Sequence, residues 1–301
     1  MSIHPDTHAV VTERAGYSDM LEVFGWLDRD PVINVYLLAL VLRDGLSSPR
    51  DEYWLARRAG TLAGLVYLGG ASGAIIPAGD DLDALAALAE RTAERLSRVP
   101  RRFQVVGPHA AVLALEARLR QGGLAPRRLR PQTYMAVEPG GLPDFRRLPE
   151  LAPARPEHYE LVFRTGAELR AEELEEDPRE ADPDGYARRV EEECRDGYTY
   201  LWLEDGELRF RASLSALTAD AVQVSGVYTP PESRNRGYAR RGLAELCTRL
   251  FARTTAACLF VNDSNAPALA LYRRLGFRPL AAWASAFFDG AGTSRAGRVS
   301  A

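Results

Sequence analysis

The residue types best suited to chemistry lie where a strand, a loop and a helix are predicted to follow one another, between Val227 and Ala239. The first turn of a helix has free N–H groups and a partial positive charge, which together suit a pyrophosphate. Gly237 and Ala239 are small enough for phosphate oxygens to approach the backbone. Arg234 and Arg236 can add charge-assisted hydrogen bonds. The segment therefore predicts a phosphate-binding helix start.

A plain structural role fits the same residues. Helix starts that contain glycine are common, and the pattern lacks the lysine that phosphate-binding loops of nucleotide hydrolases carry. On these residues alone, a phosphate site and an ordinary helix start with Gly237 near its N-terminus both stay open. The elements around the segment and a second motif bear on the choice.

Hydrophobic spacing and turn residues predict the elements that would position this segment. A buried strand is predicted over 221–227, a helix over about 236–253 and another strand over 257–261. A further helix over 266–275 is followed by Gly276, which suits a left-handed helix cap. This order of strands and helices predicts an α+β fold with helices packed on a sheet.

A composition shift divides the chain into two halves. Prolines and a Gly-Gly pair are concentrated over 141–156, which predicts a linker between a first domain, 1–140, and a second domain, 157–288. The apolar end of the second domain suits a last strand, and 289–301 is predicted to be a flexible tail. Both halves show strand, tight turn and strand, and later strand and helix. The repeat predicts a duplicated fold.

Bulk properties exclude several classes of protein. The formal net charge is −3, which gives no reason to expect a nucleic-acid partner. The three cysteines show no paired short spacing, and the four histidines form no metal-ligand pattern. The longest apolar run, 31–42, is too short to span a bilayer and is predicted to be a buried helix. A cytoplasmic protein without a metal or a membrane partner is expected, while its oligomeric state stays unknown.

A family resemblance rests on two blocks of residues. Residues 234–239, Arg-x-x-Gly-x-Ala, resemble the Gln/Arg-x-x-Gly-x-Gly/Ala signature of the GNAT superfamily of N-acetyltransferases. Residues 262–277 resemble the family's second conserved block, Asn-x-x-Ala-x-x-x-Tyr-x-x-x-Gly-Phe. Both blocks occur in the family's order, and the resemblance covers roughly residues 155–288. It implies a GNAT-like fold in two tandem copies, of which the N-terminal one is degenerate because it lacks both signatures.

The resemblance implies a role for each matching residue. The residues that would bind the CoA pyrophosphate, mostly through backbone N–H groups, are Arg234, Asn235, Arg236, Gly237, Tyr238, Ala239 and Arg240. Val227, Tyr228 and Thr229 would pair with the pantetheine arm, and a backbone N–H near Val227 would polarise the thioester carbonyl. Asn265 matches an asparagine that contacts the cofactor, and it would equally suit a helix N-cap.

Tyr272 matches the family's tyrosine that protonates the leaving CoA thiolate. A phenol with a pKa near 10 is a competent donor to a thiolate. Packing is the alternative role, because Ala268, Leu271 and Leu275 share its helical face. The resemblance thus implies transfer of an acetyl group from acetyl-CoA to a primary amine by direct attack in a ternary complex, without a metal. A catalytically inactive acyl-CoA-binding sensor or structural module is the alternative.

The base and the acceptor stay open. An acidic run in the helical region that borders the family's acceptor site could attract an amine or take its proton, or could be a solvated helical face. It consists of Glu172, Glu173, Glu175, Glu176 and Asp177. Gln223 and Ser225 could line the acceptor cleft. In the N-terminal half, Asp80 and Asp81 stand where a cofactor loop would fall and would repel a pyrophosphate, so no acetyl-CoA site is expected there.

Overall fold

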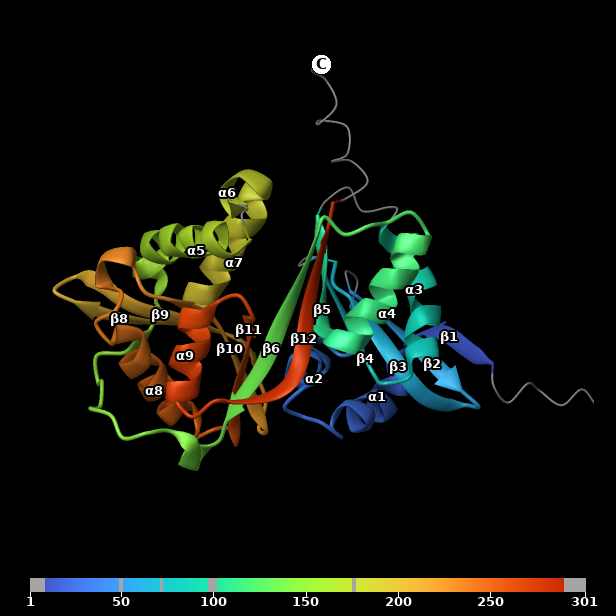
Figure 1. Cartoon of the computed structure of the whole chain (residues 1–301), viewed down its shortest axis with the longest axis horizontal. Helices are drawn as coiled ribbons and strands as arrows, with labels where there is room; N and C mark the ends of the chain where they lie inside the picture. The colour runs from blue at the N-terminus through green and yellow to red at the C-terminus, as the bar shows by residue number, and fades with distance from the viewer. Residues whose placement is uncertain (1–8, 49–50, 71–72, 97–101, 175–176, 290–301) are drawn as a thin grey trace, which may run out of the picture. The chain divides into compact units, whose positions relative to one another are not determined.

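The computed structural model describes residues 9–48, 51–70, 73–96, 102–174 and 177–289. Strands and helices follow one another along the whole described chain (Figure 1). The strands are β1 (Val10–Arg14), β2 (Glu52–Arg58), β3 (Thr61–Leu68), β4 (Ala74–Ala78), β5 (Phe103–Pro108), β6 (Arg128–Val137), β7 (Ala152–Pro153), β8 (Thr199–Glu204), β9 (Glu207–Leu217), β10 (Ala221–Tyr228), β11 (Ala256–Asn262) and β12 (Arg278–Phe288). The α-helices are α1 (Met20–Leu27), α2 (Val35–Asp44), α3 (Leu82–Leu96), α4 (His109–Gln121), α5 (Tyr159–Leu174), α6 (Pro178–Ala181), α7 (Pro183–Asp196), α8 (Tyr238–Leu250) and α9 (Ala266–Arg274).

The chain forms two compact units that are not simple halves of the sequence. The described part of the first unit runs to Met135 and also contains Phe260–Ala266 and residues 279–289. The second unit contains Ala136–Leu259 and Pro267–Arg278. Strands β6, β11 and β12 therefore each have residues in both units. The linker predicted over 141–156 and the domain limits drawn from it stay a prediction.

The first unit contains a strand, β12, that comes from the far end of the chain. Its strands follow the order β1-β2-β3-β4-β5-β12-β6. Strand β12 runs antiparallel to β5, with Trp283 opposite Pro108 and Phe288 opposite Phe103. The rings of Phe103 and Phe288 stack at 4.9 Å between centroids. The predicted last strand is present, and its partner β5 lies in the N-terminal part of the sequence.

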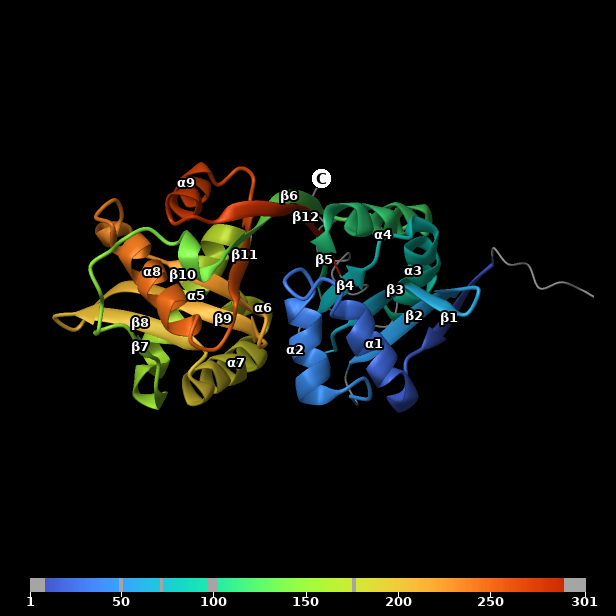
Figure 2. The same cartoon turned by 90° about the horizontal axis from the view of Figure 1, so that it is seen from below.

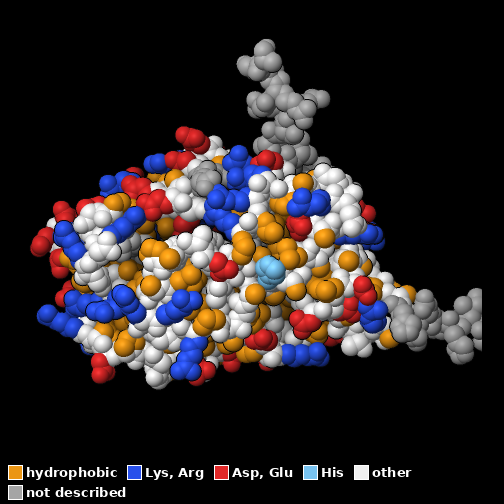
Figure 3. Space-filling model, in the orientation of Figure 1, with side chains coloured by type: hydrophobic (Ala, Val, Ile, Leu, Met, Phe, Trp, Pro, Cys, Tyr) orange, Lys and Arg blue, Asp and Glu red, His pale blue; other side chains and the backbone are white. Residues whose placement is uncertain are grey.

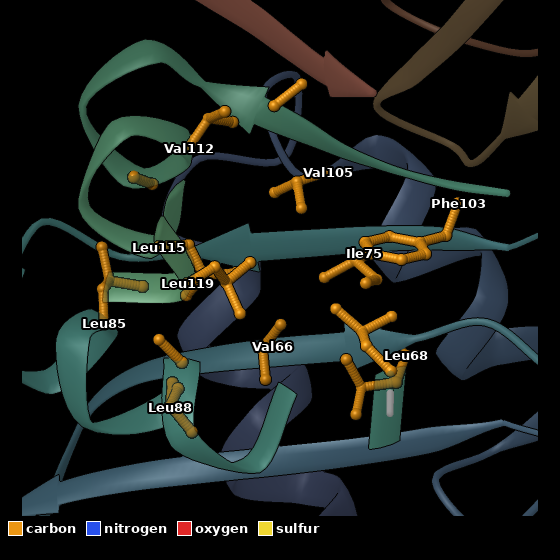
Figure 4. Close-up of a cluster of buried hydrophobic side chains, with 14 of the residues drawn as sticks. Val66, Leu68, Ile75, Leu85, Leu88, Phe103, Val105, Val112, Leu115 and Leu119 are labelled. Carbon is orange, nitrogen blue, oxygen red and sulfur yellow. The ribbon is translucent and has the colours of Figure 1, made fainter. Parts of the chain in front are cut away.

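Helices cover both faces of the first unit's sheet (Figure 2). Because side chains alternate along a strand, Val66 and Leu68 pack under α3 and α4, while Leu65 and Tyr67 pack under α1 and α2. Figure 4 shows the cluster beneath α3 and α4. The buried helix predicted over 31–42 is α2, which begins later than predicted and is buried along one side.

The second unit is a smaller sheet with helices on both faces. Its strands follow the order β11-β10-β9-β8-β7, and only the β10–β11 pair is parallel. Helices α5 and α7 share an apolar cluster with β8, β9 and β10. Helix α8 packs closely on β9 at Gly242, where an added Cβ would lie 2.4 Å from the Phe210 ring. The arrangement fixes the end of β10 and the start of α8, which carry the predicted chemistry.

A buried carboxylate joins α8 to the segment before α5. Glu245 is 1% exposed and accepts hydrogen bonds from Arg147 Nε at 2.7 Å, Arg249 Nε at 2.8 Å and the Leu148 backbone N–H at 3.0 Å. The hydrogen bond from Arg147 is the main reason why the pKa of Glu245 is lowered to about 2. Two cations and an amide thus hold the segment around residue 148 against the helix that begins at the candidate site.

Candidate active site

Strand β10 contains an irregularity next to the predicted thioester position. Ser225 lies opposite Ser213 and Tyr228 lies opposite Arg211, so two residues of β10 face a single residue of β9. Gly226 adopts a positive φ of 58°, and an added Cβ there would lie 3.3 Å from Ser213 Oγ. Such a bulge removes Gly226 and Val227 from the regular ladder. The role of the Val227 backbone in binding the thioester stays a prediction, and the bulge leaves this residue outside the regular β9–β10 register.

Strands β10 and β11 separate after a short parallel ladder. Among the described residues their ladder joins Ala221 to Ala256, Val222 to Ala257 and Gln223 to Cys258. Both strands continue well beyond these pairs. The rest of β10, which includes Val227 and Tyr228 but not Thr229, consequently forms no ladder with β11 among the described residues.

The loop after β10 leads into an open helix start. Asn235 and Gly237 both have positive φ, 62° and 84°, and the first helical hydrogen bond runs from the Arg241 N–H to the Gly237 carbonyl at 3.0 Å. The N–H groups of the first turn of α8 have no acceptor within the helix. Gly237 is exposed, and an added Cβ there would meet no atom within 4 Å. This loop therefore presents backbone donors and the positive end of a helix dipole to open space.

The polar side chains of the loop and of the first turn of α8 differ in whether they have a partner among the described residues. Arg234 donates to Glu172 at 2.9 Å and to the Thr229 carbonyl at 3.1 Å. Arg236 and Arg240 are exposed and make no ion pair with any described residue. The buried Thr229 Oγ1 likewise has no hydrogen-bond partner among the described residues. Arg236 and Arg240 can therefore bind an anion directly. Arg234 could bind one only by breaking its ion pair with Glu172 or by contacting the anion and Glu172 together.

The ring of Tyr238 anchors the first turn of α8. It lies edge-on to Trp202 at 4.8 Å between centroids, and its hydroxyl donates to Glu204 at 3.1 Å. Tyr238 thus contributes to the site through its backbone position, because its side chain is held by β8. Ala239, the next residue, is half-buried and adds no bulk over the helix start.

Tyr272 is the buried side chain of α9. Its residue is 8% exposed, its ring lies 5.8 Å from that of Phe277, and no described residue hydrogen-bonds its hydroxyl. Burial, and then the charge of Glu173, raise the pKa of Tyr272 above its ordinary value. Gly276 ends the helix with a φ of 86°, and the Phe277 N–H donates to the Tyr272 carbonyl at 3.0 Å. The predicted cap thereby fixes the tyrosine.

Asn265 occupies the position directly before α9. Its backbone N–H donates to the Asn262 carbonyl at 2.9 Å, which forms the turn that starts the helix. Asn265 belongs to the first unit, whereas Tyr272 belongs to the second. The helix-capping and cofactor-contacting roles of Asn265 stay predictions.

The described members of the acidic run have different surroundings. Glu175 and Glu176 lie outside the described residues. Asp177 caps α6 by accepting from the Arg179 N–H at 2.9 Å, and Glu172 pairs with Arg234. Glu173 is exposed, and its charge acts on Tyr272. Of the run, Glu173 is therefore the described carboxylate with an electrostatic effect on a candidate catalytic group.

Glu168, which sequence reasoning missed, also belongs to this region. It accepts a hydrogen bond from the Tyr228 hydroxyl at 2.9 Å, and burial followed by this bond raises the pKa of Tyr228. Its position four residues before Glu172 on α5 was the available signal. Gln223, by contrast, is buried and donates to Ser215 Oγ at 2.9 Å, and Ser225 Oγ lies 3.5 Å from the Ser213 carbonyl.

The corresponding helix start in the first unit carries its own carboxylate. Asp81 accepts from the Ala84 N–H at 3.0 Å and pairs with Arg58 Nε at 2.8 Å. The Arg58 hydrogen bond is the main cause that lowers the pKa of Asp81 to about 2. An anion at the start of α3 would meet a fixed negative charge, which agrees with the reason given for expecting no acetyl-CoA site there.

Comparison with known families assigns each half separately. Residues 167–277 match the acetyltransferase (GNAT) family, and residues 51–162 match a domain of unknown function, DUF4081. A comparison with curated proteins finds no match.

Solved structures extend the likeness over most of the chain. A GNAT-family protein from Novosphingobium aromaticivorans is 22% identical, covers 85% of this chain and 97% of its own, and has a TM-score of 0.52. A tandem GNAT protein from the clavulanic acid biosynthesis pathway is 15% identical, with 93% and 98% covered and a TM-score of 0.54. A Drosophila protein is 12% identical, with 95% and 100% covered and a TM-score of 0.65.

Residues 167–277 thus match the GNAT acetyltransferase family, and the chain shares its fold with solved structures that include a tandem GNAT protein. The predicted GNAT-like α+β fold with two tandem copies is confirmed. None of the described helices is long and apolar enough to cross a membrane. Among the described residues, no group of three or more His, Cys, Asp or Glu side chains could hold a metal ion.

Proposed function

We propose that the protein is an N-acetyltransferase that moves an acetyl group from acetyl-CoA to a primary amine by direct attack in a ternary complex. The observation that carries this proposal is the open start of α8, with Gly237 at positive φ beneath unoccupied space. It lies in the part of the chain that matches the GNAT family. The donors fit a pyrophosphate, because the exposed helix start, its dipole and two arginines without an ion pair to any described residue, Arg236 and Arg240, lie within a few positions of one another.

The residues of β10 and α9 support distinct steps of the reaction. The amine nitrogen forms a bond to the thioester carbonyl carbon, and the carbon–sulfur bond then breaks. The Val227 N–H, released from the ladder by the bulge, donates to the carbonyl oxygen as negative charge develops there. The Tyr272 hydroxyl gives its proton to the departing sulfur and regains one from solvent. The amine's surplus proton passes to water or to a nearby carboxylate.

Two measurements test this proposal together. Calorimetry with acetyl-CoA should show binding at one site per chain. Release of free CoA thiol should then be followed against a panel of amines, amino acids and peptides. Absence of acetyl-CoA binding would refute the proposed function. Binding without turnover on any amine would favour the alternative, a catalytically inactive acyl-CoA-binding module.

The setting of the proposed reaction follows from the same features. The three cysteines, Cys194, Cys247 and Cys258, are free and buried, which supports a reducing, cytoplasmic setting. Acidic and basic side chains are interspersed on the face shown in Figure 3, and the net charge is −3. We therefore propose small-molecule or peptide amines as partners, without a metal and without nucleic acid.

A further inference from the structure

Helices α5 and α7 of the second unit enclose a buried arginine on β9. Arg211 is 3% exposed and donates from Nη1 to the Val162 carbonyl at 2.9 Å and to Thr165 Oγ1 at 3.0 Å. Its Nη2 lies 3.6 Å from a Glu193 carboxylate oxygen. Its Nε has no hydrogen-bond partner among the described residues. The charge is thus only partly compensated in a place where water is largely excluded.

A second arginine shares the neighbourhood without a carboxylate of its own. The Arg170 guanidinium carbon lies 5.8 Å from the centroid of the Tyr186 ring. No described residue forms a hydrogen bond or an ion pair with Arg170, although the residue is partly buried. Burial, and then repulsion by Arg189, lower the pKa of Arg170. A guanidinium that gives up water without a counter-charge is costly, so an anion there would stabilise it.

The carboxylates around Arg170 and Arg211 already have other partners. Arg170 and Arg211 both interact with the carboxylate of Glu193, and the Glu168 carboxylate nearby accepts the Tyr228 hydroxyl. The Glu193 carboxylate is itself engaged, because Thr199 Oγ1 donates to it at 2.9 Å. The ion pair of Arg211 with Glu193 leaves the guanidinium of Arg170 without an ion-pair partner among the described residues.

The arginine cluster adjoins the candidate transfer centre. Arg211 lies directly opposite Tyr228 in the β9–β10 ladder, and Tyr228 follows Val227. A Cβ added at Gly226 would lie 3.8 Å from Leu169, the residue before Arg170. Leu169 and Arg211 therefore connect the surroundings of Arg170 to the bulge whose amide would bind the thioester.

We propose that Arg170, with Arg211 behind it, binds the carboxylate of the amine acceptor, which is therefore an amino acid or a short peptide with a free carboxylate. This inference rests on the proposed function. A guanidinium is a planar donor that matches the two oxygens of a carboxylate, and the Tyr186 ring beside Arg170 restricts its plane.

A binding experiment tests the subsite without any need for turnover. Amino acids and their carboxamides are titrated calorimetrically into the full chain, and inorganic phosphate serves as the comparison anion. We expect at least one amino acid to bind about tenfold more tightly than its carboxamide, and Arg170→Gln to abolish that difference. Arg164→Gln and Arg188→Gln remove exposed arginines from α5 and α7 and should leave it unchanged.

The kinetics of acetyl transfer provide a second test of the subsite. For the amino acid that binds, Arg170→Gln should raise KM about tenfold while kcat changes little, because the subsite binds a group remote from the bond that forms. Equal affinity for amino acids and carboxamides throughout the panel, or a stronger response to phosphate, would overturn the carboxylate subsite and leave acetyl transfer standing. Carboxylate-dependent binding with no transfer would support the subsite and refute the enzyme.

Discussion

The hydroxyl of Tyr272 is suited to act as an acid because of where it is buried. Apolar surroundings disfavour the phenolate, and the negative charge of Glu173 disfavours it further, so the pKa of Tyr272 is raised. A tyrosine with a raised pKa stays protonated throughout the physiological range and beyond its ordinary value of about 10. The group is therefore protonated in its resting state, as a proton donor must be.

This leads to a prediction for the Tyr272→Phe variant. Loss of the proton donor should lower kcat by about 100-fold, while acetyl-CoA affinity changes by less than about twofold. The wild-type kcat should show no decline from Tyr272 deprotonation up to about pH 10. Thiol release and calorimetry measure the two quantities. Tyr198→Phe, at an exposed tyrosine, is the control, and an unchanged kcat in Tyr272→Phe would assign the ring a packing role only.

Glu245 allows a prediction about stability and pH. Its folded-state pKa, about 2, lies below the ordinary value of 4.5, so its contribution is present above about pH 4.5 and is lost as the pH falls toward 2. Glu245→Gln should lower the unfolding free energy by about 3 kcal/mol at pH 7 and by much less near pH 2. Urea unfolding measures both. Glu191→Gln removes an exposed carboxylate of α7, and a loss of similar size there would contradict the assignment.

At the scale of elements, the loop between β10 and α8 depends on an unusual backbone conformation. Gly237 reverses the chain direction at positive φ immediately before the helix begins. An alanine there has room for its Cβ, so the cost is conformational, about 1 kcal/mol, together with a methyl group above the first amides. The effect on ligand binding should therefore exceed the effect on folding.

A matched pair of glycine variants separates these effects. Gly237→Ala should weaken acetyl-CoA binding about tenfold or more and lower the unfolding free energy by about 1 kcal/mol. Gly123→Ala carries a similar strain, because Gly123 has a φ of 88° and open space around it, but it follows α4 in the first unit. Gly123→Ala should therefore lower the unfolding free energy without changing the affinity for acetyl-CoA. Equal acetyl-CoA affinity in both variants would show that the start of α8 does not hold the cofactor.

The elements that sequence predicted well are those specified by nearby residues. The cap at Gly276 and the helix after Gly237 depend on backbone preferences and spacing within a few positions, which a sequence displays directly. The arginine cluster was not predictable, because Arg170, Arg189 and Arg211 are three of 38 basic residues and meet only through tertiary packing. The bond between Glu168 and Tyr228 joins residues sixty positions apart. The spacing of Glu168 and Glu172 indicates a shared helix face, but it does not indicate the contact with Tyr228.

At the scale of the molecule, β12 makes the first unit depend on the end of the described chain. Its pairing with β5 and the Phe103–Phe288 stack are contacts that a sequence boundary near residue 140 would cut. Ala284, Ala286 and Phe288 belong to the same buried cluster as Val105. The first unit is consequently incomplete without residues from the far end of the sequence.

A truncation tests this dependence. A fragment of residues 1–140 should unfold without a cooperative transition. In that fragment β5 lacks its partner strand β12, and the buried cluster lacks the side chains that β12 contributes. The same fragment joined through a flexible linker to residues 279–289 should regain a cooperative urea transition, followed by circular dichroism. Cooperative unfolding of the short fragment with the stability of the longer one would contradict the structural role of β12.

The position of β12 in the chain also sets the order of events during synthesis. A ribosome releases β5 long before it has translated Trp283–Phe288, the segment that must lie against it. During that interval the newly made β5 offers unpaired peptide groups to any other strand nearby. Two nascent chains on one messenger can trade their late strands at this stage, so intertwined dimers are the characteristic misassembly that this topology invites.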